Sequence, residues 1–303
     1  MLDTRKGDAL LAVIDTGSFE QAAALLHLTP SAVSQRVSAM ESELGTPLIV
    51  RSKPCRATAA GQRLVQYLRR SRLLEEEFLA ENGQSDARQL SVALAVNNDT
   101  LATWLLPGLA DFLVAEKILL DILLDDQDHT YRLLSQGLAL AGVSSEAEPM
   151  RGCQVAPLGA MRYRLLAAPA FAARWFPGGL DREAARLTPL MVFDRKDTLQ
   201  SNFLQRELGL PPGSYPCHFM PASEAFLRAI MLGLGYGMVP EQQFGDLVEQ
   251  GQLVDLAPDK PSDVMLYWHA WRVQSPKLER LSAQVIAAAR AVLLQAETTK
   301  PAS

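Results

Sequence analysis

The sequence predicts an α and α/β protein with three parts: a small three-helix head with a basic wing, one long linker helix, and a two-lobed α/β body. Three observations predict this architecture. Residues 1–58 carry three short helical patterns, a helical period continues over residues 59–85, and apolar runs alternate with helical patterns over residues 90–303. We expect one domain or element for each of these ranges.

The charge distribution separates the head from the body. The chain has 303 residues and a formal net charge of −5. Residues 1–72 carry ten Lys or Arg and six Asp or Glu, a balance of +4, while the remainder carries nineteen and twenty-eight, a balance of −9. A cationic head on an acidic body indicates that only the head meets an anionic partner.

Composition also restricts the class of protein. With 48% hydrophobic and 21% charged residues, the chain should bury a core. The N-terminus lacks a secretory pattern, and no run approaches the roughly 18 apolar residues of a membrane helix. Cys55, Cys153 and Cys217 are far apart and have no metal-binding spacing. We therefore expect reduced thiols and a cytoplasmic protein with no membrane partner.

The head contains start and stop signals for three helices. The first pattern, "GDALLAVIDTG", ends at Gly17, and Ser18 is an N-cap for "FEQAAALL". Thr29 is a natural N-cap for the third helix, with Pro30 at its first position and Gly45 at its end. The order of helix, tight turn and helix is that of a helix-turn-helix, although plain helical packing would give the same pattern.

The third helix has an unusual outer face. Val33, Val37, Met40 and Leu44 form an apolar stripe at helical spacing. Short hydroxyls let a helix backbone approach a DNA groove, and long donors can reach base edges. The opposite face holds such side chains: Ser31, Ser34, Gln35, Arg36 and Ser38.

A basic segment follows this helix. Arg51, Lys53 and Arg56 lie on a stretch that Pro47 and Pro54 keep out of helix. Such a cluster is often only a solvated loop, but beside a recognition helix it predicts a wing that contacts phosphates. The expected DNA-binding residues are Ser18, Pro30, Ser31, Ser34, Gln35, Arg36, Ser38, Arg51, Lys53 and Arg56.

The long helix that follows has a stripe of its own. Heptad positions fall at Leu64, Ser71 and Phe78 and at Tyr67 and Leu74. The pattern covers barely two heptads, so a lone amphipathic helix is the alternative. Because the stripe must be buried somewhere, a second copy of the chain is the simplest partner.

The body alternates strands and helices. "LSVALAV" and "LALAGVSS" read as strands, "ILLDILLDD" as a buried strand, "HTYRLLSQG" as a helix, and the chain closes with a helix at about residues 276–297. This alternation predicts parallel sheets with helices on their faces. The expected lobes are residues 90–160 with 268–303, and residues 161–267.

A ligand site is expected where strands end in this body, since ligands of α/β sheets bind beyond the carboxyl ends of the strands. The loop "NNDT" offers backbone N–H groups to a ligand carboxylate, although its side chains could simply cap a helix. The acids could be solvated, but as a set they favour a cationic ligand side chain. The expected effector-binding residues are Asn97, Asn98, Asp99, Thr100, Asp126, Ser144, Asp194, Ser223 and Glu224.

Nothing in the sequence predicts catalysis. His27, His129, His218 and His269 have no metal-ligand spacing, and neither a nucleophile elbow nor a phosphate-binding loop is present. His269, in an apolar run, reads as a satisfied core residue. We expect no catalytic residue, no metal and no cofactor.

The segment from Leu10 to Gly61, with "GSFEQAA", "LTPSAVSQRVSAMESELGTPLIVR" and T-x-x-G, resembles the winged helix-turn-helix of LysR-type transcriptional regulators. The resemblance covers the whole chain. "SVALAVNNDTLATWLLPGL", "LPPGSYPCH", "ASEAF" and "MLYWH" are similar to the lysine- and arginine-responsive branch, the ArgP and LysG type, whose members activate exporters of basic amino acids. Many relatives carry Gln where this chain has Pro30, so Gln35 must do more of any base reading.

The resemblance implies a homodimer or homotetramer with a body like the periplasmic binding proteins. The implied partners are double-stranded promoter DNA, a lysine or arginine effector, a further copy of the chain and, as a candidate, RNA polymerase. The expected function is activation of transcription in response to the effector. Two alternatives stay open: a ligand-independent architectural or replication-origin-binding protein, and an α/β enzyme.

Overall fold

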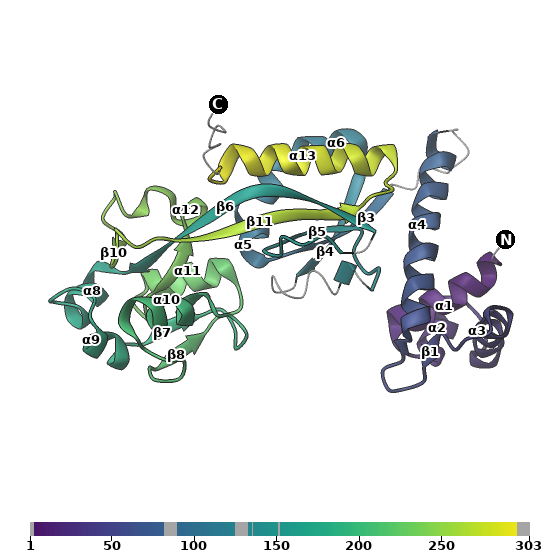
Figure 1. The fold of residues 1–303 in the computed structure, drawn as a ribbon, viewed down its shortest axis with the longest axis horizontal. Helices are drawn as coiled ribbons and strands as arrows, with labels where there is room; N and C mark the ends of the chain where they lie inside the picture. Colours follow the sequence, from purple (N-terminus) through teal and green to yellow (C-terminus); the bar gives the residue numbers. More distant parts are fainter. Residues whose placement is uncertain (1–2, 82–89, 125–132, 135, 151, 296–303) are drawn as a thin grey trace, which may run out of the picture. The chain divides into compact units, whose positions relative to one another are not determined.

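The computed structural model describes residues 3–81, 90–124, 133–134, 136–150 and 152–295. It divides into two compact units (Figure 1). The first unit holds Met1–Ala93 and Arg132–Leu140, and the second holds Leu94–Tyr131 and Ala141–Ser303. The two units are described separately below.

Three helices form the head of the first unit: α1 (Thr4–Thr16), α2 (Phe19–Leu25) and α3 (Pro30–Leu44). Their ends follow the predicted signals. The side chains of Ser18 and Thr29 accept hydrogen bonds from N–H groups of the first turns, and Gly17 and Gly45 leave α1 and α3 with positive φ angles of 68° and 63°. The local signals therefore fix the three helices.

The apolar stripe of α3 is confirmed at three of its four positions. Val33, Val37 and Met40 are fully buried against α1 and α2. Leu44 is 43% exposed, so its predicted burial is wrong. Gly45 turns the chain immediately after Leu44, and the last helical residue therefore lies at the margin of the three-helix core.

The basic segment folds as a small antiparallel hairpin, β1 (Ile49–Val50) and β2 (Arg56–Ala57). The Glu41 carboxylate on α3 accepts hydrogen bonds from the Leu48 and Ile49 N–H groups at 2.7 and 3.3 Å. The predicted wing is thereby tied to the helix it flanks.

Helix α4 spans Ala59–Glu81. Leu64, Val65 and Leu68 pack on the core of the head, whereas Tyr67 and Phe78 of the predicted stripe are 56% and 64% exposed. Residues 82–85 of the expected linker lie outside the described residues. The outer part of α4 thus presents apolar side chains to its surroundings.

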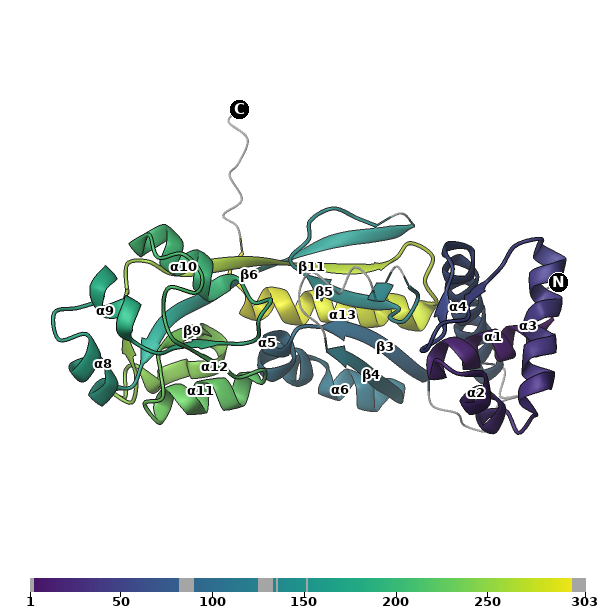
Figure 2. The same ribbon diagram turned by 90° about the horizontal axis from the view of Figure 1, so that it is seen from below.

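The second unit is built on a mixed sheet in the order β10-β6-β11-β5-β3-β4, with β9 also paired to β6. Its longest strands, β6 and β11, are neighbours that run through the length of the unit (Figures 1 and 2). The bounds are β3 (Leu90–Val96), β4 (Ile118–Leu124), β5 (Ala141–Ser144), β6 (Cys153–Ala167), β9 (Gly237–Pro240), β10 (Val254–Asp255) and β11 (Ser262–Trp271).

The predicted all-parallel pairing is wrong for this sheet. Strands β3 and β5 are parallel, but β11 is antiparallel to both β5 and β6. Strands β5 and β6 follow each other in the chain and run in the same direction, because β11 is antiparallel to both, but they are not neighbours in the sheet. Strand β11 lies between them instead.

Two further expectations need correction. Strand β4 is the last strand in the order and is not buried throughout, since Leu119 and Leu124 are half exposed. The closing helix α13 spans Pro276–Val292 and ends before residue 297, because Leu293 is extended and Leu294 exchanges backbone hydrogen bonds with Ala160.

Helices and a small sheet complete the second unit. Strands β7 (Leu190–Val192) and β8 (Cys217–Phe219) pair in parallel at one end of β6 and β11, and α13 packs on α6 at the other (Figure 1). The remaining elements are α5 (Asn98–Thr100), the π-helical turn η1 (Leu101–Leu105), α6 (Leu106–Glu116), α8 (Pro169–Trp175), α9 (Arg182–Leu187), α10 (Leu199–Leu208), α11 (Ser223–Met231), α12 (Glu241–Phe244) and the 3₁₀ turn η2 (Gly245–Leu247). The predicted helix at residues 129–137 lies largely outside the described residues.

Candidate functional sites

The outer face of α3 presents the polar side chains that the sequence places there. Ser31 and Gln35 are exposed, and Ser34, Arg36 and Ser38 are half-buried. Pro30 is exposed at the first helical position, where its missing N–H costs no hydrogen bond. The helix therefore offers short hydroxyls near its start and two longer donors one turn further on.

The wing adds positive charge beside this face. Arg51, Lys53 and Arg56 are all exposed. The Arg51 guanidinium donates to the Ser38 hydroxyl of α3 at 3.3 Å and stacks 5.1 Å from the centre of the Phe19 ring. These contacts place one cation of the wing directly next to the outer face of α3.

Ser18 caps α2, as the sequence predicts, and this role occupies the hydroxyl that is also expected to contact DNA. Its hydroxyl accepts from the Glu20 and Gln21 N–H groups at 3.2 and 3.4 Å and donates to the Glu20 carboxylate at 2.6 Å. This hydrogen bond, with that of its own backbone N–H, lowers the pKa of Glu20. Ser18 is therefore the N-cap of α2, and any contact with DNA would have to share its hydroxyl with that cap.

The second unit contains a pocket of about 300 Å³, within the range of small-molecule sites. It lies among the start of α5, the middle of β6, the start of α10, the start of α11 and the β9–α12 junction. Among the residues that the structure describes, its charged members are Asp99, Asp197 and Lys196. Polar and apolar side chains complete the wall, including Asn97, Asn98, Ser145, Tyr163, Gln200, Ser223, Phe226, Met238 and Gln243.

Asp99 is held by two hydroxyl groups from distant parts of the chain. The Tyr163 hydroxyl on β6 donates to Oδ2 at 2.8 Å, and the Ser223 hydroxyl at the start of α11 donates to Oδ1. Burial raises the pKa of Asp99 above its usual range, although both hydrogen bonds act in the opposite direction. The carboxyl group is thus oriented and desolvated at the wall of the pocket.

Asp197 is the second carboxyl group of the pocket. It accepts hydrogen bonds from the Phe193 and Leu199 N–H groups at 3.2 and 2.9 Å. Burial is the main cause that raises its pKa, and the negative charge of Asp99 raises it further. Two carboxyl groups that disfavour each other's charge therefore share one pocket.

The structure places the predicted effector residues in three groups. Asn97, Asn98, Asp99 and Ser223 line the pocket. Asn97 is also the N-cap of the helix, because its side chain accepts from the Thr100 N–H at 2.7 Å. Four expected residues do not line the pocket: Thr100, Ser144, Asp194 and Glu224. The remaining one, Asp126, lies outside the described residues.

Each displaced residue has a physical reason. Thr100 has no exposed surface, and the buried Ser144 hydroxyl accepts from the Glu146 N–H at 3.1 Å, so Ser145 reaches the pocket instead. Asp194 accepts from the Lys196 and Asp197 N–H groups and closes a turn. Glu224 points to solvent from α11. Asp126 is among the residues that the structure does not describe.

Most lining residues were not among those expected from the sequence, and the ones with a titratable side chain are Tyr163, Lys196 and Asp197. Lys196 and Asp197 stand in the same "FDRKD" stretch as Asp194, so the segment was identified but not the residue. For Tyr163 the only signal is its place in an apolar strand with Arg162 and Arg164 on either side. Strand alternation then directs the tyrosine to the face opposite the arginines.

No metal centre is present among the residues that the structure describes: no group of three or more His, Cys, Asp or Glu is placed to hold an ion. His269 is buried, as predicted, and its Nε2 lies 2.7 Å from the Glu146 carbonyl oxygen. Its Nδ1 has no partner among the described residues, so the predicted satisfied core histidine is satisfied at one nitrogen. Burial lowers the pKa of His269. No described helix is long and apolar enough to cross a membrane.

Comparison with known families agrees with this geometry. Residues 5–62 match the bacterial regulatory helix-turn-helix proteins of the LysR family, and residues 84–290 match the LysR substrate binding domain. The chain therefore belongs to the LysR family and is a LysR-type transcriptional regulator with a DNA-binding head and a substrate-binding body.

Within the family, the chain is similar to the regulators called ArgP and LysG. It is 41% identical to ArgP of Aeromonas salmonicida over 94% of this chain and 96% of that protein. It is likewise 41% identical to LysG of Mycobacterium tuberculosis, over 95% and 94% of the two chains.

Solved structures give the same result. ArgP from Mycobacterium tuberculosis superposes with a TM-score of 0.85 at 40% identity, covering 98% of this chain and all of that one. Full-length LysG from Corynebacterium glutamicum with bound effector arginine has a TM-score of 0.78 at 36% identity, covering 97% and 100% of the two chains. The chain is thus a regulator of the ArgP and LysG type.

Proposed function

We propose that this regulator responds to a basic amino acid, lysine or arginine, bound in the pocket of its second unit. The observation that carries the proposal is the charged set on the pocket wall: Asp99, Asp197 and Lys196. Lysine and arginine have two cationic groups and one carboxylate, the complementary set. Because an unpaired charge is costly to bury, a neutral or acidic amino acid would leave one carboxyl group without a partner.

In this proposal Asp99 and Asp197 receive the two cationic groups of the effector. Lys196, together with the polar groups of Asn97 and Asn98, faces the effector carboxylate. The bound arginine of the LysG structure from Corynebacterium glutamicum supports arginine as one effector. Ser223 contributes through its hydrogen bond to Asp99.

For the head, we propose that α3 enters the major groove of promoter DNA. Gln35 and Arg36 then reach base edges, while the hydroxyls of Ser31, Ser34 and Ser38 let the backbone approach. The exposed cations of the wing, Arg51, Lys53 and Arg56, contact phosphates. Pro30 can contribute only apolar contact at the start of the helix.

The biological setting follows from these two sites. The protein acts by binding, without catalysis or a cofactor, and works in the cytoplasm, where promoter DNA is accessible. Copies of the chain associate through the exposed stripe of α4 into a dimer or tetramer. The proposed output is activation of amino acid export genes, through contact with RNA polymerase.

Calorimetric titration of the full chain tests the effector. L-arginine or L-lysine should bind, whereas citrulline, which has the shape of arginine without its cation, should bind at least about tenfold more weakly. Glutamate should not bind. A promoter footprint that changes on addition of the effector would support regulation, whereas equal binding of arginine and citrulline would exclude the proposed charge pairing. If no amino acid binds, a ligand-independent DNA-binding role becomes the better account.

A further inference from the structure

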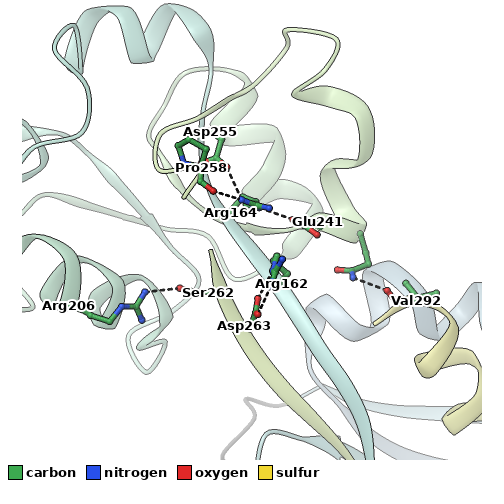
Figure 3. Close-up of polar contacts among 10 residues, drawn as sticks. Arg162, Arg164, Arg206, Glu241, Asp255, Pro258, Ser262, Asp263 and Val292 are labelled. Carbon is green, nitrogen blue, oxygen red and sulfur yellow. Dashed lines mark hydrogen bonds and ion pairs between the residues drawn. The ribbon is translucent and has the colours of Figure 1, made fainter. Parts of the chain in front are cut away.

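Tyr163 lies at the centre of the second unit, on a strand segment that is firmly anchored. Its neighbours Arg162 and Arg164 point to the other face of β6. Arg162 makes two hydrogen bonds of 2.7 and 2.8 Å to Asp263 on β11, and Arg164 pairs with Glu241 of α12 at 2.7 Å (Figure 3). These ion pairs fix the backbone from which the tyrosine reaches into the pocket.

The contact that Tyr163 makes is with Asp99. Its side chain is almost fully buried, and its hydroxyl donates to Oδ2 of Asp99 at 2.8 Å. Ser223 donates to the other oxygen. A carboxylate can accept about four hydrogen bonds, so each oxygen keeps a free lone pair for a ligand. The hydroxyls therefore set the direction in which Asp99 accepts an effector cation.

The same two hydrogen bonds control the charge of Asp99. A hydroxyl that donates to a carboxylate favours its charged form, while burial favours the neutral form. Burial is the larger effect and raises the pKa of Asp99, and the hydrogen bonds from Ser223 and Tyr163 partly offset it. The pKa of Tyr163 is raised well above its usual value, mainly by burial, so its hydroxyl keeps its proton and acts as a donor.

The charged groups around Asp99 come from several elements. The segment before α10 contributes Lys196 and Asp197 to the pocket. A negative charge on Asp197 disfavours a negative charge on Asp99. On α11 the nearest acid in sequence, Glu224, is exposed and does not line the pocket. On α12 and β6, Glu241 and Arg164 pair with each other. Among the described residues, Asp197 and Lys196 are therefore the charged groups that share the pocket with Asp99.

We propose that Tyr163 is a positioning residue: its hydroxyl orients Asp99 toward the effector cation and, by its hydrogen bond, favours the carboxylate form that binds the cation. The proposal rests on the proposed function, since it requires a cationic effector. The balance is simple. Where Asp99 carries a proton, binding breaks its O–H bond, the proton leaves to solvent, and the resulting carboxylate pairs with the effector cation.

The test is titration of the full chain with L-arginine over a range of pH, in two buffers whose ionisation enthalpies differ. The heat difference between the buffers measures the protons released. The wild type should release protons, and its affinity should fall as the pH falls. In Tyr163→Phe the pKa of Asp99 rises further, so affinity at neutral pH should drop about tenfold, proton release should increase, and most of the loss should disappear at alkaline pH.

Tyr267→Phe is the matched control, because it removes a tyrosine hydroxyl from β11 outside the pocket and should leave affinity and proton release unchanged. Asp99→Asn is the second variant: it should bind arginine weakly and with less proton release than the wild type. An equal loss of affinity at every pH in Tyr163→Phe would make the tyrosine merely structural and overturn the inference. Wild-type proton release in Asp99→Asn, or arginine binding by the wild type without proton release, would also overturn it. If the wild type binds no basic amino acid, the proposed function itself fails.

Discussion

The affinity for arginine should depend strongly on Asp197. The substitution Asp197→Asn removes a negative charge from the pocket wall while keeping the size of the side chain. The amide oxygen can still accept the 2.9 Å hydrogen bond from the Leu199 N–H, but the amide nitrogen cannot accept the 3.2 Å bond from the Phe193 N–H. The variant should therefore lose ligand affinity and, to a smaller degree, stability.

The magnitude follows from the type of interaction lost. A hydrogen bond to a charged group contributes about 1.5–3 kcal/mol, and about 1.4 kcal/mol changes an equilibrium constant tenfold. The Kd for arginine should therefore rise about 10- to 100-fold, whereas that for citrulline should change little. The lost backbone hydrogen bond should cost about 1 kcal/mol of unfolding free energy, measurable by denaturant titration.

The pH dependence gives a second measurement. Burial raises the pKa of Asp197, and the ionised form is the one that pairs with a cation. Wild-type affinity should thus fall as the pH falls through this raised pKa, and the Asp197→Asn variant should lose that part of the dependence. Glu224→Gln is the control, because it removes an exposed carboxylate outside the pocket wall. Arginine binding by Asp197→Asn within twofold of the wild type would show that the effector cation does not meet Asp197.

Three further outcomes are expected. Arg51→Ala should weaken binding to all DNA sequences and reduce the slope of log affinity against log salt by about 1. Gln35→Ala should mainly relax sequence preference. Gel-shift titrations at several salt concentrations measure both effects, and equal behaviour of the two variants would contradict the assigned roles. Gly61→Ala should destabilise the head by about 2 kcal/mol or more in thermal unfolding, because a Cβ there would lie 2.0 Å from the Leu48 carbonyl oxygen. Gly178→Ala, in open space, is its neutral control.

The head was predictable because its signals are local. Ser18, Thr29, Gly17 and Gly45 define helix ends through contacts within a few residues, and the structure places each of them as expected. The misplaced Leu44 depends on what lies beyond the helix end, which the helical period alone does not contain. Local capping chemistry therefore predicts the helices better than it predicts the edges of their core.

The body was less predictable because strand order depends on distant segments. Alternating strands and helices suggested parallel pairing, but β11, more than a hundred residues from β5 in sequence, lies between β5 and β6. The same limit applies to the pocket. The sequence located the acidic segment after β7, but it did not show that Asp194 closes a turn and that Asp197 lines the pocket.

The arrangement of the pocket explains how a small ligand could alter this regulator. Asp99 lies at the start of α5, whereas Asp197 and Ser223 belong to the segments around β7 and β8. A ligand that pairs with the carboxyl groups of both Asp99 and Asp197 therefore links elements from the two ends of β6 and β11. A tenfold difference in effector affinity between two conformations of the protein needs about 1.4 kcal/mol, less than one charged hydrogen bond contributes. A single contact that forms in only one of two conformations would therefore be enough for the effector to shift the population, and Asp99, which accepts a hydrogen bond from Ser223, is well placed to make that contact.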